Sequence, residues 1–148
     1  MNIPAFLTVL FVSLISQASL HGNWTGWGVW KYQGEDPGMR CQSMNMTWTE
    51  SEKVISIDQG KYDCDFFVMH LGKTEWRIQD GQLFNEAKKE VGTYDGTNFE
   101  VYMPAAEGET TSIHIKLKRE ANHIDFREVW YNEKEKIYVI EGRLFTGG

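Results

Sequence analysis

Apolar and polar residues alternate along much of the chain, which is the pattern of β-strands with one buried face. In segment 113–118, Ile113, Ile115 and Leu117 alternate with histidine and lysine. In segment 99–103, apolar residues alternate with glutamate and tyrosine. Side chains at every second position of a strand share a face. Segment 85–90 has a weak helical period, but it is short and charged. We therefore predict an all-β fold.

Clusters of turn-forming residues separate these strands at fairly even spacing. The sharpest signals are Asp80-Gly81 and Asp95-Gly96, because a type I′ hairpin turn needs a positive φ at both central residues. An antiparallel up-and-down meander of this size removes its exposed edges by closing on itself. We predict one small barrel of roughly eight to ten strands, with turns at 34–38, 50–53, 59–60, 72–73, 79–82, 95–96, 106–109, 119–122 and 132–136.

The beginning of the chain has a different pattern, and we predict that residues 1–18 are a signal peptide. An uncharged apolar stretch, 5–15, is followed by Ser16-Gln17-Ala18, which has the small-x-small pattern of a signal peptidase site. The stretch is shorter than the roughly 20 apolar residues that a membrane span needs. We expect residues 19–148 to form a single secreted or periplasmic domain without a membrane anchor.

The two cysteines are placed to form one disulfide in an oxidising compartment. Segments 39–49 and 54–63 are strand-like and are separated by a polar turn. If they form an antiparallel hairpin centred between residues 52 and 53, Cys41 lies opposite Cys64. We predict a structural disulfide, since the C-x-x-C spacing of redox sites is absent.

The same register makes two further predictions about the hairpin. It pairs the apolar Trp48 with Ile57, and it pairs the polar Thr47 with Asp58. Apolar side chains then meet apolar ones and polar side chains meet polar ones across the two strands.

The composition narrows the range of functions. The chain has 15 Lys and Arg against 21 Asp and Glu, a net charge of −6, which argues against nucleic-acid binding. No serine lies in a nucleophile elbow and neither cysteine is expected to be free, so we expect no enzyme activity. The histidines lack the i, i+2 or i, i+4 spacing of metal ligands. We therefore expect no metal and no cofactor, the four histidines being His21, His70, His114 and His123.

One acidic residue and several aromatic ones are candidates for ligand binding. Glu128 has the parity of Phe126 and Trp130, so its side chain points inward unless a local bulge turns it to solvent. A carboxylate inside a barrel is costly without a hydrogen-bond partner, so we expect it to contact a polar group, a water or a ligand. Aromatic residues line small-molecule sites, although the same rings also fill cores. The predicted ligand-binding residues are Trp30, Trp48, Trp76, Phe99, Phe126, Glu128, Trp130 and Tyr138.

The two ends of the predicted domain carry a family resemblance. The first strand begins with the G-x-W sequence Gly22-Asn23-Trp24, and the last strand contains Arg143. This pairing resembles the lipocalin and wider calycin pattern, in which the tryptophan closes the barrel floor and a basic residue from the final strand lies across it. The resemblance implies that Trp24 and Arg143 take these roles and that the barrel is a calycin-like cup for a ligand.

Our leading hypothesis is an exported lipocalin-like protein that binds a small, largely apolar ligand inside the barrel. Glu128 or a nearby polar group would fix the ligand's orientation. The alternative is a secreted or periplasmic protein-binding module or inhibitor, whose loops 34–38 and 106–109 would contact a protein partner. A filled interior would argue against the first hypothesis, and an exposed aromatic patch near the loops would favour the second.

Overall fold

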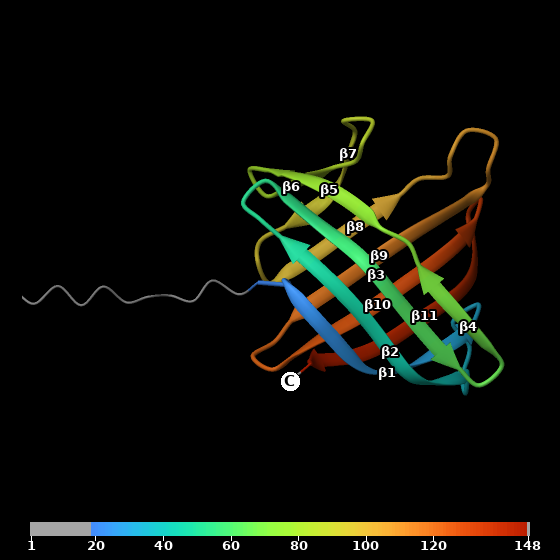
Figure 1. Cartoon of the computed structure of the whole chain (residues 1–148). Helices are drawn as coiled ribbons and strands as arrows, with labels where there is room; N and C mark the ends of the chain where they lie inside the picture. The colour runs from blue at the N-terminus through green and yellow to red at the C-terminus, as the bar shows by residue number, and fades with distance from the viewer. Residues whose placement is uncertain (1–18, 148) are drawn as a thin grey trace, which may run out of the picture.

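The computed structural model describes residues 19–147, and it confirms the all-β prediction (Figure 1). The predicted signal peptide, residues 1–18, lies outside the described residues. Within residues 19–147, no helix is long and apolar enough to cross a membrane. The strands are β1 (Gly22–Tyr32), β2 (Met39–Glu50), β3 (Val54–Cys64), β4 (Phe67–Leu71), β5 (Thr74–Gln79), β6 (Gln82–Phe84), β7 (Glu90–Tyr94), β8 (Asn98–Met103), β9 (Thr111–Arg119), β10 (His123–Asn132) and β11 (Glu135–Thr146).

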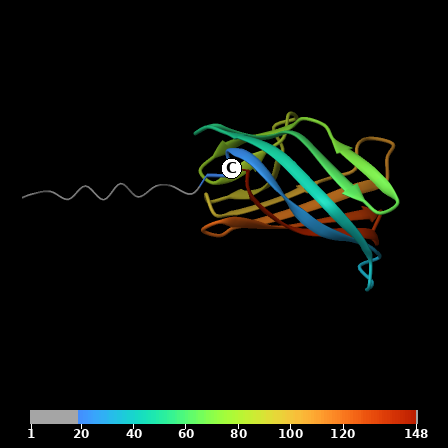
Figure 2. The same ribbon diagram turned by 60° about the horizontal axis from the view of Figure 1, so that its bottom comes forward.

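Ten of these strands form a closed ring of antiparallel neighbours. Their order is β2-β1-β11-β10-β9-β8-β7-β6-β5-β3, and β3 pairs back to β2. Figure 2 shows the strands wrapping obliquely around a common axis, with the first strand beside the last. The remaining strand, β4, is outside the ring and pairs with the second half of β3, while β5 pairs with the first half.

Inward-facing apolar side chains fill much of the barrel, as the alternation predicts. In β9, Ile115 and Leu117 are buried and the lysines beside them are exposed. In β8, Phe99 and Val101 are buried, and Glu100 and Tyr102 beside them are exposed. Burial of every second side chain removes apolar surface from water and stabilises each strand against its neighbours.

The hairpin of β2 and β3 confirms the predicted disulfide. Cys41 faces Cys64 in the register of the two strands, and the cysteines are bonded to each other. Trp48 faces Ile57, also as predicted.

One predicted pair in this hairpin is wrong, because the strands contain bulges. Thr47 faces Gln59 rather than Asp58, since β3 has one extra residue at this point. A second bulge, at Gln42 in β2, restores the original register before Cys41. Two bulges on opposite strands therefore cancel, and the cysteines still meet.

One predicted turn is wrong, because residues 59–60 continue β3. A side chain at Gly60 would meet Leu71 and the Asn45 carbonyl, so the glycine allows close packing of the strands. The turn at 65–66, which separates β4 from β3, was not predicted. Segment 85–90, with its weak helical period, is a turn leading into β7, in agreement with the all-β prediction.

Candidate functional site

The two ends of the barrel are built differently. The end that carries Ser19 and Gly147, at the left of Figure 1, we call the floor. The opposite end carries the loops 33–38, 65–66 and 104–110, and we call it the mouth.

Aromatic rings fill the interior next to the floor. Phe99 is edge-on to both Trp48 and Trp76, with ring centroids 5.2 Å apart in each case. All three side chains are at most 2% exposed. The indole Nε1 of Trp48 has no hydrogen-bond acceptor within residues 19–147. Three of the predicted ligand-binding residues therefore pack against one another, as the core-filling interpretation of these rings expects.

The first described residues seal the floor. Leu20 is 1% exposed, and its backbone N–H donates to Oε2 of Glu50 at 2.7 Å. The same oxygen accepts hydrogen bonds from the hydroxyls of Ser19 and Tyr94, each at 2.9 Å. Glu50 thus joins the N-terminal segment to β7 and to the β2–β3 turn.

Trp24 lies in the floor and is covered by a basic residue from an unexpected strand. Its Nε1 donates to the carbonyl oxygen of Leu20 at 2.7 Å. The guanidinium of Arg119, at the end of β9, lies over the indole ring, 5.0 Å from its centroid. Arg119 also donates to the carbonyl oxygen of Ser19. A cation over an indole face is a favourable contact.

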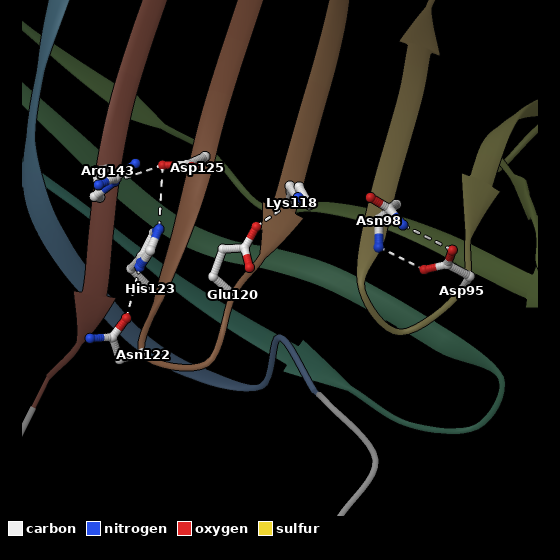
Figure 3. A network of polar contacts seen from close by, with 8 residues as sticks. All are labelled: Asp95, Asn98, Lys118, Glu120, Asn122, His123, Asp125 and Arg143. Atoms are coloured by element: carbon white, nitrogen blue, oxygen red, sulfur yellow. Dashed lines mark hydrogen bonds and ion pairs between the residues drawn. The ribbon is translucent and has the colours of Figure 1, made fainter.

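The structure therefore corrects the expected role of Arg143. Leu144 points into the barrel, so alternation turns Arg143 to the outer surface. There Arg143 donates to Oδ1 of Asp125 at 2.7 Å, and Nε2 of His123 lies 3.7 Å from the same oxygen (Figure 3). The sequence did contain a signal for Arg119: it lies two residues after the inward-facing Leu117 in β9, so alternation places both side chains on the same face of the strand.

Glu128 is buried below the mouth, and its side chain is only 3% exposed. Its Oε2 accepts a hydrogen bond from the Tyr62 hydroxyl at 2.9 Å, and its Oε1 accepts one from Nε1 of Trp130. Phe126 packs against the ring of Tyr62, with centroids 6.0 Å apart. The inward direction predicted for Glu128 is what the structure shows.

The surroundings of the Glu128 carboxyl group change its pKa. Burial raises the pKa of Glu128, and the hydrogen bonds from Trp130 and Tyr62 act against that rise. Burial, together with the charge of Glu128, raises the pKa of the Tyr62 hydroxyl well above its usual value. None of the ion pairs within residues 19–147 includes Glu128. The carboxyl group is therefore held by neutral donors and lacks a cationic partner in the described chain.

Half-buried aromatic rings surround the mouth above Glu128. Trp130 stacks on Tyr138 with centroids 5.1 Å apart, and Tyr138 lies 5.5 Å from Trp30. Phe67, from β4, is edge-on to Trp30 at 5.8 Å. We call these four residues the rim. Three of them are predicted ligand-binding residues. Phe67 was missed because alternation along its strand left open which face is inside and the turn at 65–66 was not predicted.

Three methionines complete the apolar lining at this end. Met39, Met69 and Met103 are half-buried and pack against the core, while the residues that flank them in their strands are exposed. Methionine has an unbranched, polarisable side chain that adapts to differently shaped apolar partners. The mouth therefore combines rigid rings, adaptable thioethers and one buried carboxyl group.

The outer surface has a different feature, a broad depression of about 670 Å³ across β8 to β11 and β1. Trp27, 57% exposed, lies at one side of it. Most of the charged side chains that line it pair with one another, as in Lys116 with Glu100 and Arg127 with Glu141, both at 3.1 Å. Lys118 also lines it and pairs with Glu120 beside it. The charges of the depression are therefore largely neutralised by ion pairs.

Within residues 19–147, no three His, Cys, Asp or Glu side chains form a cluster that could hold a metal ion. The chain matches no protein-family model and no curated protein sequence. The resemblance to lipocalins therefore stays a prediction, and the mouth has to be interpreted from its own residues.

Proposed function

We propose that this is an exported lipocalin-like protein that binds a small, largely apolar molecule at the mouth of its barrel. The observation that carries the proposal is the buried Glu128, hydrogen-bonded by Tyr62 and Trp130, directly beneath a rim of half-buried aromatic rings. Small-molecule sites combine apolar and aromatic walls with a few convergent polar groups that orient the ligand.

The ligand would lie in the outer half of the barrel, because the rings next to the floor already fill the inner half. Its apolar part would contact Trp30, Trp130 and Tyr138. A polar group on the ligand would exchange hydrogen bonds with the carboxyl group of Glu128 or the hydroxyl of Tyr62. A ligand without such a polar group would add no hydrogen bond to those that Glu128 and Tyr62 already make with each other, and we expect it to bind less well.

Export is the second part of the proposal. The apolar segment 5–15 and the cleavage pattern after it support a signal peptide. The disulfide between Cys41 and Cys64 supports an oxidising compartment, where such bonds persist.

A protein-binding role is the second candidate, and one observation favours it. Tyr32 and Phe66 are 57% and 87% exposed, and both lie beside loops of the mouth. Exposed aromatic side chains near loops are typical of surfaces that bind other proteins. In this case the rim would support a docking surface rather than hold a small molecule.

Native mass spectrometry of the protein purified from its own host tests the first proposal. We expect a reproducible extra mass that is lost on denaturation, and the value of that mass would characterise the ligand. A bare protein would favour the protein-binding candidate, and a pull-down from the same host would then be the next measurement.

A matched pair of variants tests whether any ligand binds at the mouth. Trp30 and Trp27 are both on β1, but Trp30 lies in the rim and Trp27 on the outer face. With a neutral environment-sensitive dye as probe, we expect Trp30→Ala to weaken binding at least tenfold and Trp27→Ala to leave it unchanged. Equal effects of the two variants would contradict a site at the mouth.

A further inference from the structure

One strand of the sheet has a free edge. Within residues 19–147, β4 pairs with β3 on one side and with no strand on the other. Figure 1 shows it at the right-hand end of the barrel. The ladder between β3 and β4 has no bulge from Phe67 to Leu71, so the edge is regular.

The turn before β4 determines which backbone groups face this edge. Cys64 and Phe67 flank a two-residue turn and form the pair that closes it. The closing pair of such a hairpin is hydrogen-bonded, and hydrogen-bonded pairs alternate along an antiparallel ladder. Met69 therefore bonds to β3, whereas the N–H and C=O groups of Val68 and His70 point to the free edge.

This edge lacks the features by which proteins normally prevent strand pairing. Exposed edges are usually protected by charged residues, prolines or bulges. β4 has the sequence Phe-Val-Met-His-Leu, without any of these. Val68 and Phe66, which are 48% and 87% exposed, add apolar surface beside the free backbone groups.

The edge is also complementary to itself. When two copies of β4 are placed antiparallel and centred on Met69, Val68 of each copy lies opposite His70 of the other. These are the residues whose backbone groups are free, so the pairs are hydrogen-bonded. The exposed Asp65, in the turn before β4, then lies at the same end of the contact as the exposed Lys73, which follows β4 in the other copy, and this occurs twice. Lys73 also lies 3.8 Å from Glu75 of its own chain. A parallel arrangement would instead bring like charges together.

From this complementarity we infer that two copies of the chain associate through their β4 edges as a symmetric dimer. The symmetry is two-fold, because each residue of the contact meets the same partner in both directions. The inference rests on the edge of the sheet and is independent of what the mouth binds.

Analytical ultracentrifugation of protein purified from its host, over micromolar to millimolar concentrations, tests the dimer. We expect a reversible shift from the monomer mass to twice that mass. Val68→Pro removes an N–H that faces the free edge and none that bonds to β3, so we expect dimerisation at least tenfold weaker. A proline at Thr93 would disrupt the ring, so the matched control uses lysine instead. Val68→Lys and Thr93→Lys add the same charge at two exposed strand positions, and only the change at Val68 should weaken the dimer.

Charge reversal tests the register itself. We expect Asp65→Lys or Lys73→Asp alone to weaken the dimer, and the double variant to restore it. Circular dichroism verifies that each variant is folded. A monomer at every concentration overturns the inference, whether or not the edge binds a peptide from another protein. A dimer that neither Val68→Pro nor the charge reversals affect overturns it as well.

Discussion

The floor and the mouth each contain a glutamate that accepts a hydrogen bond from a tyrosine, but their surroundings differ. Glu50 accepts three hydrogen bonds on one oxygen, two of them from the chain's own residues 19 and 20. Glu128 accepts one hydrogen bond on each oxygen, from neutral donors only. The floor is therefore sealed by the chain itself, whereas the mouth leaves a buried polar group beneath half-buried rings. This difference is why we place the candidate site at the mouth, although the same strands also form the floor.

The two ends also differ in what stabilises them. The floor is held by interlocked rings that are almost completely buried. The mouth has half-buried rings, but it carries the disulfide that joins β2 to β3 next to Phe67.

Truncation of one ring at each end measures the difference in packing directly. We expect Trp76→Ala to lower the free energy of unfolding by about 3 to 5 kcal/mol, since it leaves a cavity in a filled core. Trp30→Ala should cost clearly less, because the side chain of Trp30 is half-buried. Urea denaturation at constant pH measures both values. Equal losses would contradict the distinction between a filled floor and an open mouth.

Removal of the disulfide, by changing Cys41 and Cys64 to alanine, should lower the free energy of unfolding by about 3 kcal/mol. The bond spans a sequence separation of 23 residues, so its loss increases the entropy of the unfolded chain. Hydrogen exchange would locate the effect: amides of β2, β3 and β4 near the mouth should exchange faster, and those near the floor should change least. Uniform acceleration throughout the barrel would argue against a locally stapled mouth.

Variants of Arg119 and Arg143 test which of the two arginines stabilises the floor through Trp24. Arg119→Met removes the cation over the indole and the hydrogen bond to the Ser19 carbonyl, and we expect it to cost about 1 to 2 kcal/mol of stability. Arg143→Met removes an ion pair on the outer surface and should have a much smaller effect. Thermal unfolding of the two variants side by side provides the comparison. A larger loss for Arg143 would restore the role that the family resemblance implied.

The smallest expected effect concerns the pH dependence that Glu128 causes. Burial raises its folded-state pKa above the unfolded value of about 4.3. A group of this kind contributes its full stability below the unfolded pKa and loses it as the pH rises through the folded pKa. Relative to Glu128→Gln, the wild type should therefore lose stability as the pH rises from about 4 toward neutrality.

The glutamine variant is a close match for the neutral carboxyl group. Its amide oxygen can accept from Trp130, and its amide N–H can donate to the hydroxyl oxygen of Tyr62. Denaturation curves of both proteins at several pH values give the difference. A wild type that gains stability relative to the variant over this range would show that the carboxyl group is better satisfied than its burial indicates.

Local alternation was sufficient to predict the strands, the cystine and the inward direction of Glu128. These properties depend on neighbouring residues and one short turn. The bulges at Asp58 and Gln42 were not predictable, because they depend on how β2 and β3 curve around the barrel.

The division of the candidate site was harder to predict. Trp48 and Trp130 both belong to inward faces, but Trp48 lies close to the floor and Trp130 near the mouth. Parity gives the face of a strand and not the depth along the barrel axis. The contact of Arg119 with Trp24 and the sealing by Leu20 likewise depend on strands far apart in the sequence.

The pairing of β1 with β11, from Trp24 to Thr146 at one end and Tyr32 to Tyr138 at the other, affects how the chain reaches this structure. The first described strand finds its partner in the last described strand, far along the sequence. No fragment that lacks β11 can complete the ring, and contacts between residues far apart in the sequence slow folding. The nascent chain therefore stays open, with β1 unpaired on that side, until β11 has been synthesised.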